Sequence, residues 1–197
     1  SLLSRRGYFP VSELATFRRF GTRLQGHPCV EKGLPGITQA SGSLGQGLSA
    51  AAGVALGKKL DGDDRYVYVL CGDGETEEGQ IWEAAMFAAH QNLDHLIAMT
   101  DWNGQQIDGT VNAVAGEGDL ESKWKSFGWN VIVADGHDFD SILAAFAKAK
   151  ESTGAPVMIL FKTDMGHGVD FMAGTCKWHG KAPSQDQCKE ALAQLEE

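Results

Sequence analysis

The chain has 197 residues, enough for one domain with a substantial hydrophobic core. Its 26 acidic and 17 basic side chains give a net charge of −9, which argues against nucleic acid or an anionic membrane surface as the partner. No apolar run approaches the ~20 residues of a membrane span, and the N-terminal sequence lacks the pattern of a signal peptide. The four cysteines show no CxxC spacing, so we expect reduced thiols and a cytoplasmic location.

The first part of the chain predicts helix followed by loop. Residues 1–26 have helical character, interrupted by a glycine and a proline, and a loop rich in glycine and proline runs on to residue 37. Small and apolar residues predict a buried helix over 48–59. Residues 45–50 match a dinucleotide fingerprint only superficially, because that fingerprint requires a strand immediately before it and none is predicted there.

The rest of the chain alternates strands with helices. Apolar runs predict strands at 66–71, 96–100, 129–134 and 156–161, and periodic patterns predict helices around 81–89, 120–127, 138–150 and 185–195. This alternation predicts an α/β fold, a doubly wound, mostly parallel sheet with helices on both faces. A long glycine-rich loop over 163–183 follows the last strand, and loops of that length are usually functional or disordered. We expect a single domain over residues 1–197.

Polar loops follow two of the predicted strands. Asp73, between Gly72 and Gly74, ends the first, and Asn103 follows the next strand along the chain. Right-handed crossovers bring both loops to the same edge of a parallel sheet, so we expect one crevice. Oxygen ligands without cysteine or histidine suit Mg²⁺ or Ca²⁺, and a helix N-terminus near the glycines favours a diphosphate. The acidic turn at 75–78 would repel a diphosphate unless its side chains point away or the metal shields them. A plain strand-end turn is the alternative.

These residues carry a family resemblance. Gly72-Asp73-Gly74 followed by Asn103 resembles the thiamine diphosphate motif, and the flanks GDGETEEGQIWEAAMFAAHQNLDHLIAMTDWNGQQIDG resemble transketolase, above all the separate N-terminal subunit of transketolases split into two chains. The resemblance implies the diphosphate-binding (PP-type) fold, thiamine diphosphate with Mg²⁺ (or Ca²⁺), and transfer of a two-carbon ketol unit between sugar phosphates, as in the pentose phosphate pathway. Family members carry a further upstream segment, so we expect either a fragment or a naturally short form.

The resemblance also implies roles for individual residues. The side chains of Asp73 and Asn103 and the backbone carbonyl of Gln105 would hold the metal. Contacts to the cofactor are implied for Gly42, Leu44, Gly72, Asp73, Gly74, Asn103, Ile107, Met165 and His179. His27, in LQGHP, would meet the substrate, and His179, in WHG, would reach the diphosphate and the substrate carbonyl. Without the family, both would be read as ordinary loop histidines. His167 receives no role.

A partner is implied as well. In transketolases, the glutamate that activates thiamine diphosphate and the pocket for its aminopyrimidine ring belong to another domain. The resemblance therefore implies a C-terminal, pyrimidine-binding subunit, in a homodimer or heterotetramer. Two alternatives stay open. One is a component of another thiamine diphosphate enzyme, such as deoxyxylulose phosphate synthase or a ketoacid dehydrogenase. The other is a non-catalytic module that binds the cofactor or only assembles with a partner.

Overall fold

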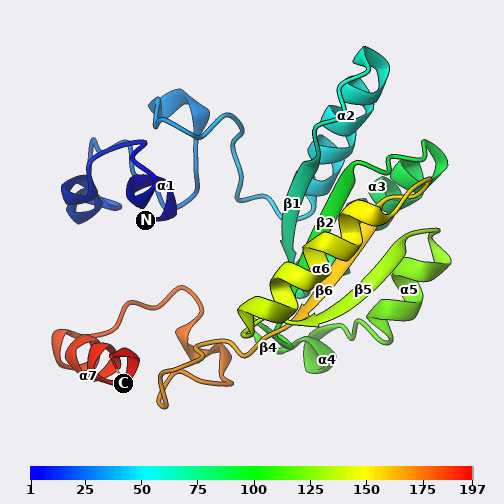
Figure 1. The fold of residues 1–197 in the computed structure, drawn as a ribbon. Coiled ribbons are helices and arrows are strands. Elements are labelled where there is room, and N and C mark those ends of the chain that lie inside the picture. The colour runs from blue at the N-terminus through cyan, green and yellow to red at the C-terminus, as the bar shows by residue number, and fades with distance from the viewer. Residues whose placement is uncertain (197) are drawn as a thin grey trace. The chain divides into compact units, whose positions relative to one another are not determined.

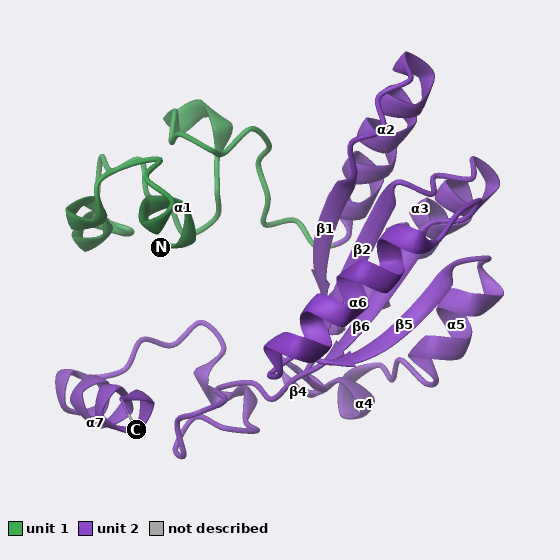
Figure 2. Cartoon of the chain, viewed as in Figure 1, with its two compact units in different colours: residues 1–44 green, residues 45–197 purple. Residues whose placement is uncertain are grey.

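The structure, a computed structural model, describes residues 1–196 and divides the chain into two compact units (Figure 1). The first is Ser1–Leu44 and the second begins at Gly45 (Figure 2). The single domain expected from the sequence stays a prediction. Within the described part of the chain, no helix combines the length and apolarity needed to cross a membrane.

The first unit contains little regular structure. It holds one α-helical turn, α1 (Leu2–Arg5), and two 3₁₀ turns, η1 (Val11–Thr16) and η2 (Val30–Lys32). The helical character expected over 1–26 is therefore confined to short turns. Left-handed backbone at Gly7, with a φ of 85°, follows the end of α1. Backbone outside the helical region at Phe17 ends η1, and left-handed backbone at Arg18, with a φ of 59°, follows it.

The second unit is built on a four-stranded parallel sheet. The strands are β1 (Val67–Gly72), β2 (Leu96–Trp102), β5 (Asn130–Asp135) and β6 (Val157–Lys162), in the spatial order β1-β2-β6-β5. All four agree with the predicted strands, with ends that differ by one or two residues. Residues Val157–Phe161 of β6 are buried without interruption, as expected for a central strand covered on both faces.

Helices cover both faces of this sheet, which confirms the predicted fold class. One face packs against α2 (Gln46–Asp61), α3 (Gly79–His90) and α5 (Leu120–Ser126), and the other packs against α6 (Phe139–Glu151) (Figure 1). On the first face, the Trp124 ring centroid lies 4.9 Å from those of Trp82 and Trp129. Trp129 Nε1 also donates to the carbonyl of Ala85 at 2.9 Å, which ties the end of α5 to α3.

Several short elements surround the carboxyl end of the sheet. A 3₁₀ turn, η3 (Gly74–Glu77), precedes α3, and a hairpin of β3 (Gln105–Gln106) and β4 (Gly109–Thr110) leads into α4 (Val111–Val114). The sequence did not predict the hairpin or α4, because two-residue strands and a single helical turn are too short to produce a periodic pattern. After β6, the long loop contains η4 (Cys176–Trp178), and α7 (Gln185–Leu195) begins at a capping box formed by Ser184 and Gln187.

Candidate functional site

Asp73 joins the loops that follow β1 and β2. Its carboxylate is 1% exposed and accepts hydrogen bonds from the backbone N–H of Gly74, at 2.7 Å, and of Gly104. The two loops that follow β1 and β2 therefore meet at one edge of the sheet. Burial raises the pKa of the Asp73 carboxyl above its ordinary value of 3.8, and the charge of Asp101 adds to the rise, while the backbone hydrogen bonds oppose it. No lysine or arginine of residues 1–196 pairs with Asp73.

The loop after β2 turns sharply so that its hairpin covers Gly74. Asn103 Oδ1 accepts from the backbone N–H of Gln105 at 2.9 Å, and Gly104 follows with a φ of 72°. A Cβ atom added to Gly74 would lie 3.0 Å from Cβ of Gln106. Glycine at position 74 thus allows the hairpin to approach closely, and a larger residue would have to displace the Gln106 side chain. The side chain of Asn103 and the backbone of Gln105 belong to the loop after β2, next to Asp73. We call the group formed by Asp73 and Asn103–Gln105 the cradle.

Hydrogen bonds compensate part of the negative charge of the acidic turn at residues 75–78. Glu75 accepts hydrogen bonds from the backbone N–H of Gly45 at 2.8 Å and of Gly72 at 3.1 Å, so backbone donors compensate both of its oxygens. Glu77 Oε2 accepts from Gln106 Nε2 at 3.1 Å. The repulsion expected from this turn is therefore reduced at Glu75.

A further acidic residue, not predicted from the sequence, lies beside the cradle. Glu117 is 6% exposed, and its Oε1 accepts a hydrogen bond from Trp102 Nε1 at 2.7 Å. Burial raises the pKa of the Glu117 carboxyl above its ordinary value of 4.5; the Trp102 hydrogen bond opposes the rise, and the charges of Asp73 and Glu77 add to it. Within residues 1–196, Glu117 Oε2 and Glu77 Oε1 are buried without a hydrogen-bond partner. Nothing in the sequence distinguishes Glu117 from a solvated loop glutamate.

In the first unit, two predicted site residues lie against each other. A Cβ atom added to Gly42 would lie 2.8 Å from Cγ of His27, and Gly42 has a φ of 133°. His27 is exposed, and Leu44, the last residue of this unit, is 55% exposed. The structure therefore joins His27 to Gly42, in a loop where only glycine fits at position 42.

The remaining predicted residues lie on loops of the second unit. Ile107, at the tip of the β3–β4 hairpin, is 65% exposed. Met165 is half-buried in the loop after β6, and His179 is exposed at the end of η4. No side-chain hydrogen bond in the described part of the chain joins His179 to the cradle. The assigned roles of these residues stay predictions.

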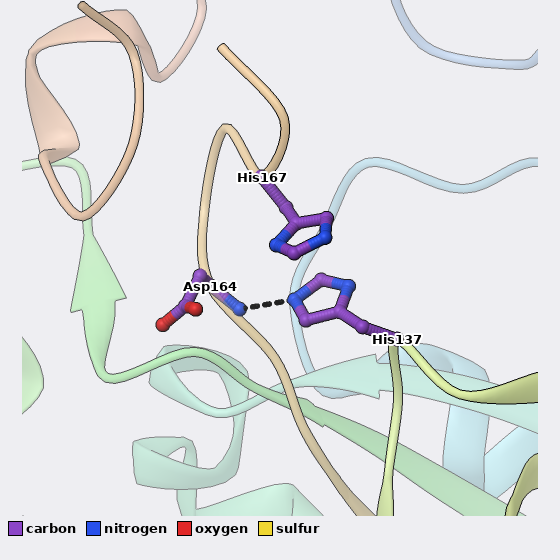
Figure 3. Close-up of side chains that lie close together, drawn as sticks. All are labelled: His137, Asp164 and His167. Carbon is purple, nitrogen blue, oxygen red and sulfur yellow. Dashed lines mark hydrogen bonds between the residues drawn. The ribbon is translucent and has the colours of Figure 1, made fainter. Parts of the chain in front are cut away.

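A second group of ligand-type side chains lies at the ends of β5 and β6 (Figure 3). The rings of His137 and His167 stack at 3.6 Å, and the backbone N–H of Asp164 donates to His137 Nε2 at 2.7 Å. That bond occupies the lone pair of His137 Nε2, so this nitrogen is not free to bind a metal ion. The two rings also lie nearly parallel, with an interplanar angle of 12°. The group is therefore not arranged as a metal site, and His167 still has no role.

Comparison with known proteins gives consistent matches. The family described as "Transketolase, thiamine diphosphate binding domain" matches residues 1–196. The chain is 46% identical over 194 residues to "6-deoxy-6-sulfo-D-fructose transketolase subunit SqwG" of Clostridium sp. (strain MSTE9), covering 98% of this chain and 70% of that protein. It is 37% identical to one of the subunits named for apulose-4-phosphate transketolase in Phocaeicola vulgatus, covering 99% and 69%. The solved structure of a transketolase from Campylobacter jejuni superposes with a TM-score of 0.86 at 32% identity; the match covers 94% of this chain and only 30% of that one.

Proposed function

Because this chain belongs to the transketolase family, as a thiamine diphosphate-binding domain, we propose that it is the diphosphate-binding subunit of a split transketolase-like enzyme. In this proposal it works with a separate C-terminal subunit that supplies the aminopyrimidine pocket. The names of similar proteins as transketolase "subunits" support this arrangement. Its assembly as a homodimer or heterotetramer is proposed from the family resemblance. Its place in the cytoplasm is proposed from the four cysteines, which show no CxxC spacing.

The observation that carries the proposal is the buried carboxylate of Asp73, which bridges the loops after two neighbouring strands. We propose that Asp73, Asn103 and the carbonyl of Gln105 hold Mg²⁺. The donor set fits, because it consists of oxygen atoms, and the buried negative charge at Asp73 has no lysine or arginine partner in the described residues. The unpaired oxygens of Glu77 and Glu117 add to the attraction for a cation.

The other predicted residues complete the proposed site. Gly72 and Gly74 let the diphosphate approach the backbone, with His179 as a further donor to it. Gly42, Leu44, Ile107 and Met165 would form the surface against the cofactor rings. When bound, thiamine diphosphate supplies the carbon nucleophile that takes up the two-carbon unit. His27 would donate to or accept from substrate hydroxyl groups, since an imidazole ring has one nitrogen that can donate and one that can accept.

The substrates we propose are sugars with an anionic group at the end remote from the ketol unit. One similar protein is named for a sulfonated fructose and the other for a sugar phosphate. Both names describe sugars with a strong acid group, a sulfonate or a phosphate. Sugar phosphates, including those of the pentose phosphate pathway, and sugar sulfonates are therefore the two classes to compare.

The first test is calorimetric titration of the chain with thiamine diphosphate, with and without Mg²⁺. Asp73→Asn keeps the size of the side chain and removes its charge, so we expect it to abolish the Mg²⁺-dependent binding that the parent shows. Asp61→Asn, which removes an exposed charge at the end of α2, is the matched control and should bind like the parent. Equal binding by Asp73→Asn and the parent would contradict the metal assignment.

The second test is activity in the assembled enzyme. The chain is mixed with a transketolase C-terminal subunit, and ketol transfer is measured from sugar phosphates and from sugar sulfonates. Turnover with either class supports the proposed role in the enzyme, and the preferred class identifies the substrate. A stable complex that binds thiamine diphosphate but gives no turnover with either would favour the non-catalytic module.

A further inference from the structure

The side chains of Glu117 and Trp102 form a hydrogen-bonded pair near Asp73, whose charge acts on the Glu117 carboxyl. The register of β1 and β2 ends at the pair of Gly72 with Asp101, so Asp73 and Trp102, the next residues of each segment, lie at the same edge of the sheet. Glu117 reaches this edge from the loop before α5, and its Oε1 accepts a hydrogen bond from Trp102 Nε1 at 2.7 Å.

The second carboxylate oxygen of Glu117, Oε2, lacks a hydrogen-bond partner within residues 1–196, although a purely structural role would require one. Glu117 is 6% exposed, and its Oε2 is buried and makes no hydrogen bond within residues 1–196. Lys123 is near enough to affect the charge of Glu117, but it forms no ion pair with it within 4.0 Å. A buried carboxylate oxygen without a donor is costly to the folded chain, and native proteins retain such groups mainly where a water or ion satisfies them.

We propose that Glu117 is a positioning residue for the metal of the cradle. In this inference, which rests on the Mg²⁺ site proposed above, Oε1 fixes Trp102 next to Asn103, and Oε2 accepts a hydrogen bond from a water molecule held by the metal. Mg²⁺ usually keeps several bound waters. Removing a residue that holds a metal-bound group in place commonly weakens the protein's affinity for the metal about 10- to 100-fold. Glu77, whose Oε1 is also unpaired within the described residues, would be the second acceptor on this side.

The variant Glu117→Gln separates this role from simple packing. Its amide oxygen still accepts from Trp102, but an amide N–H₂ replaces Oε2 and cannot accept from a metal-bound water. Mn²⁺, used as the probe in place of Mg²⁺, is titrated into the full chain with thiamine diphosphate present, and free Mn²⁺ is measured by electron paramagnetic resonance. The melting temperature of each variant is measured separately in EDTA. Glu83→Gln, which removes an exposed charge on α3 that makes no ion pair among the described residues, is the matched control.

The inference predicts that Glu117→Gln weakens Mn²⁺ binding about 10- to 100-fold, with a metal-free melting temperature equal to or above that of the parent. The control should match the parent in both measurements. Unchanged Mn²⁺ affinity would overturn the inference, and so would a lower metal-free melting temperature, which would indicate a purely structural role. If the parent binds no Mn²⁺, or if Asp73→Asn binds it as well as the parent, the proposed metal site itself fails.

Discussion

The hydrogen bond between Trp102 and Glu117 makes a quantitative prediction. Trp102→Phe removes the one side-chain hydrogen bond that the described residues make to a carboxylate that is 6% exposed. Loss of a hydrogen bond to a charged group costs about 1.5–3 kcal/mol, and the smaller ring removes about 1 kcal/mol of apolar burial. We therefore expect the free energy of unfolding of the metal-free chain to fall by about 2.5–4 kcal/mol. For a chain of this length, that corresponds to a melting temperature lower by about 5–16 °C.

A double-mutant cycle provides the assay. Thermal and urea unfolding are followed by circular dichroism in EDTA for the parent, Trp102→Phe, Glu117→Leu and the double variant. In the Glu117→Leu background no carboxylate is left unpaired at position 117, so Trp102→Phe should cost only the ring term of about 1 kcal/mol. Trp82→Phe controls for ring size, since Trp82 packs on Trp124 and has no hydrogen bond to lose among the described residues. Equal costs of Trp102→Phe in both backgrounds would refute the reasoning.

Two further predictions concern Gly42 and Asp73. Gly42→Ala places a Cβ 2.8 Å from His27 at a φ of 133°, so we expect faster limited proteolysis of the loop over residues 37–44. The control is Gly53→Ala in α2, which has open space around its Cβ and should stabilise the chain by about 0.5–1 kcal/mol. Equal rates of proteolysis for the two variants would contradict this prediction. Because the pKa of Asp73 is raised in the fold, its contribution to stability is full below its ordinary pKa of 3.8 and is lost as pH rises through the folded value. The melting temperature of metal-free Asp73→Asn, relative to that of the parent, should therefore rise as pH increases from 3.8 to the folded pKa and stay constant above it. A difference independent of pH throughout would show that the pKa of the carboxyl is not perturbed.

The strands and the long helices could be predicted from the sequence, because burial on both sides of a parallel sheet produces continuous apolar runs. β6 is the clearest case: Val157–Phe161 are buried, and this is the run expected to be a strand. The pairing of Asp73 with the Asn103 loop also followed from topology alone, since parallel strands place both loops at one edge.

The first unit was predicted less well, for a physical reason. Its apolar residues are spaced as in a helix, but the backbone leaves the helical conformation at Gly7 and again at Phe17 and Arg18, so only short helices form. The spacing of hydrophobic residues indicates which side chains are buried. It does not indicate where the backbone turns left-handed, unless a glycine marks the position. Arg18 at a φ of 59° could not have been foreseen from its residue type.

Glu117 shows why part of the candidate site escaped prediction. A sequence motif can identify residues that directly follow strands, and their chemistry can be inferred from the residue types. Glu117 instead reaches the site from a loop whose path depends on how α5 packs through Trp124. Asp73, Glu77 and Glu117 then bring three carboxyl groups close together, where burial raises the pKa of Glu117 and the charges of Asp73 and Glu77 add to the rise. Such a cluster opposes folding unless a cation compensates it. The loop that holds these carboxylates is therefore expected to gain stability when a divalent ion binds. The order of the loop from Trp102 to Glu117 should then depend on occupancy of the proposed metal site.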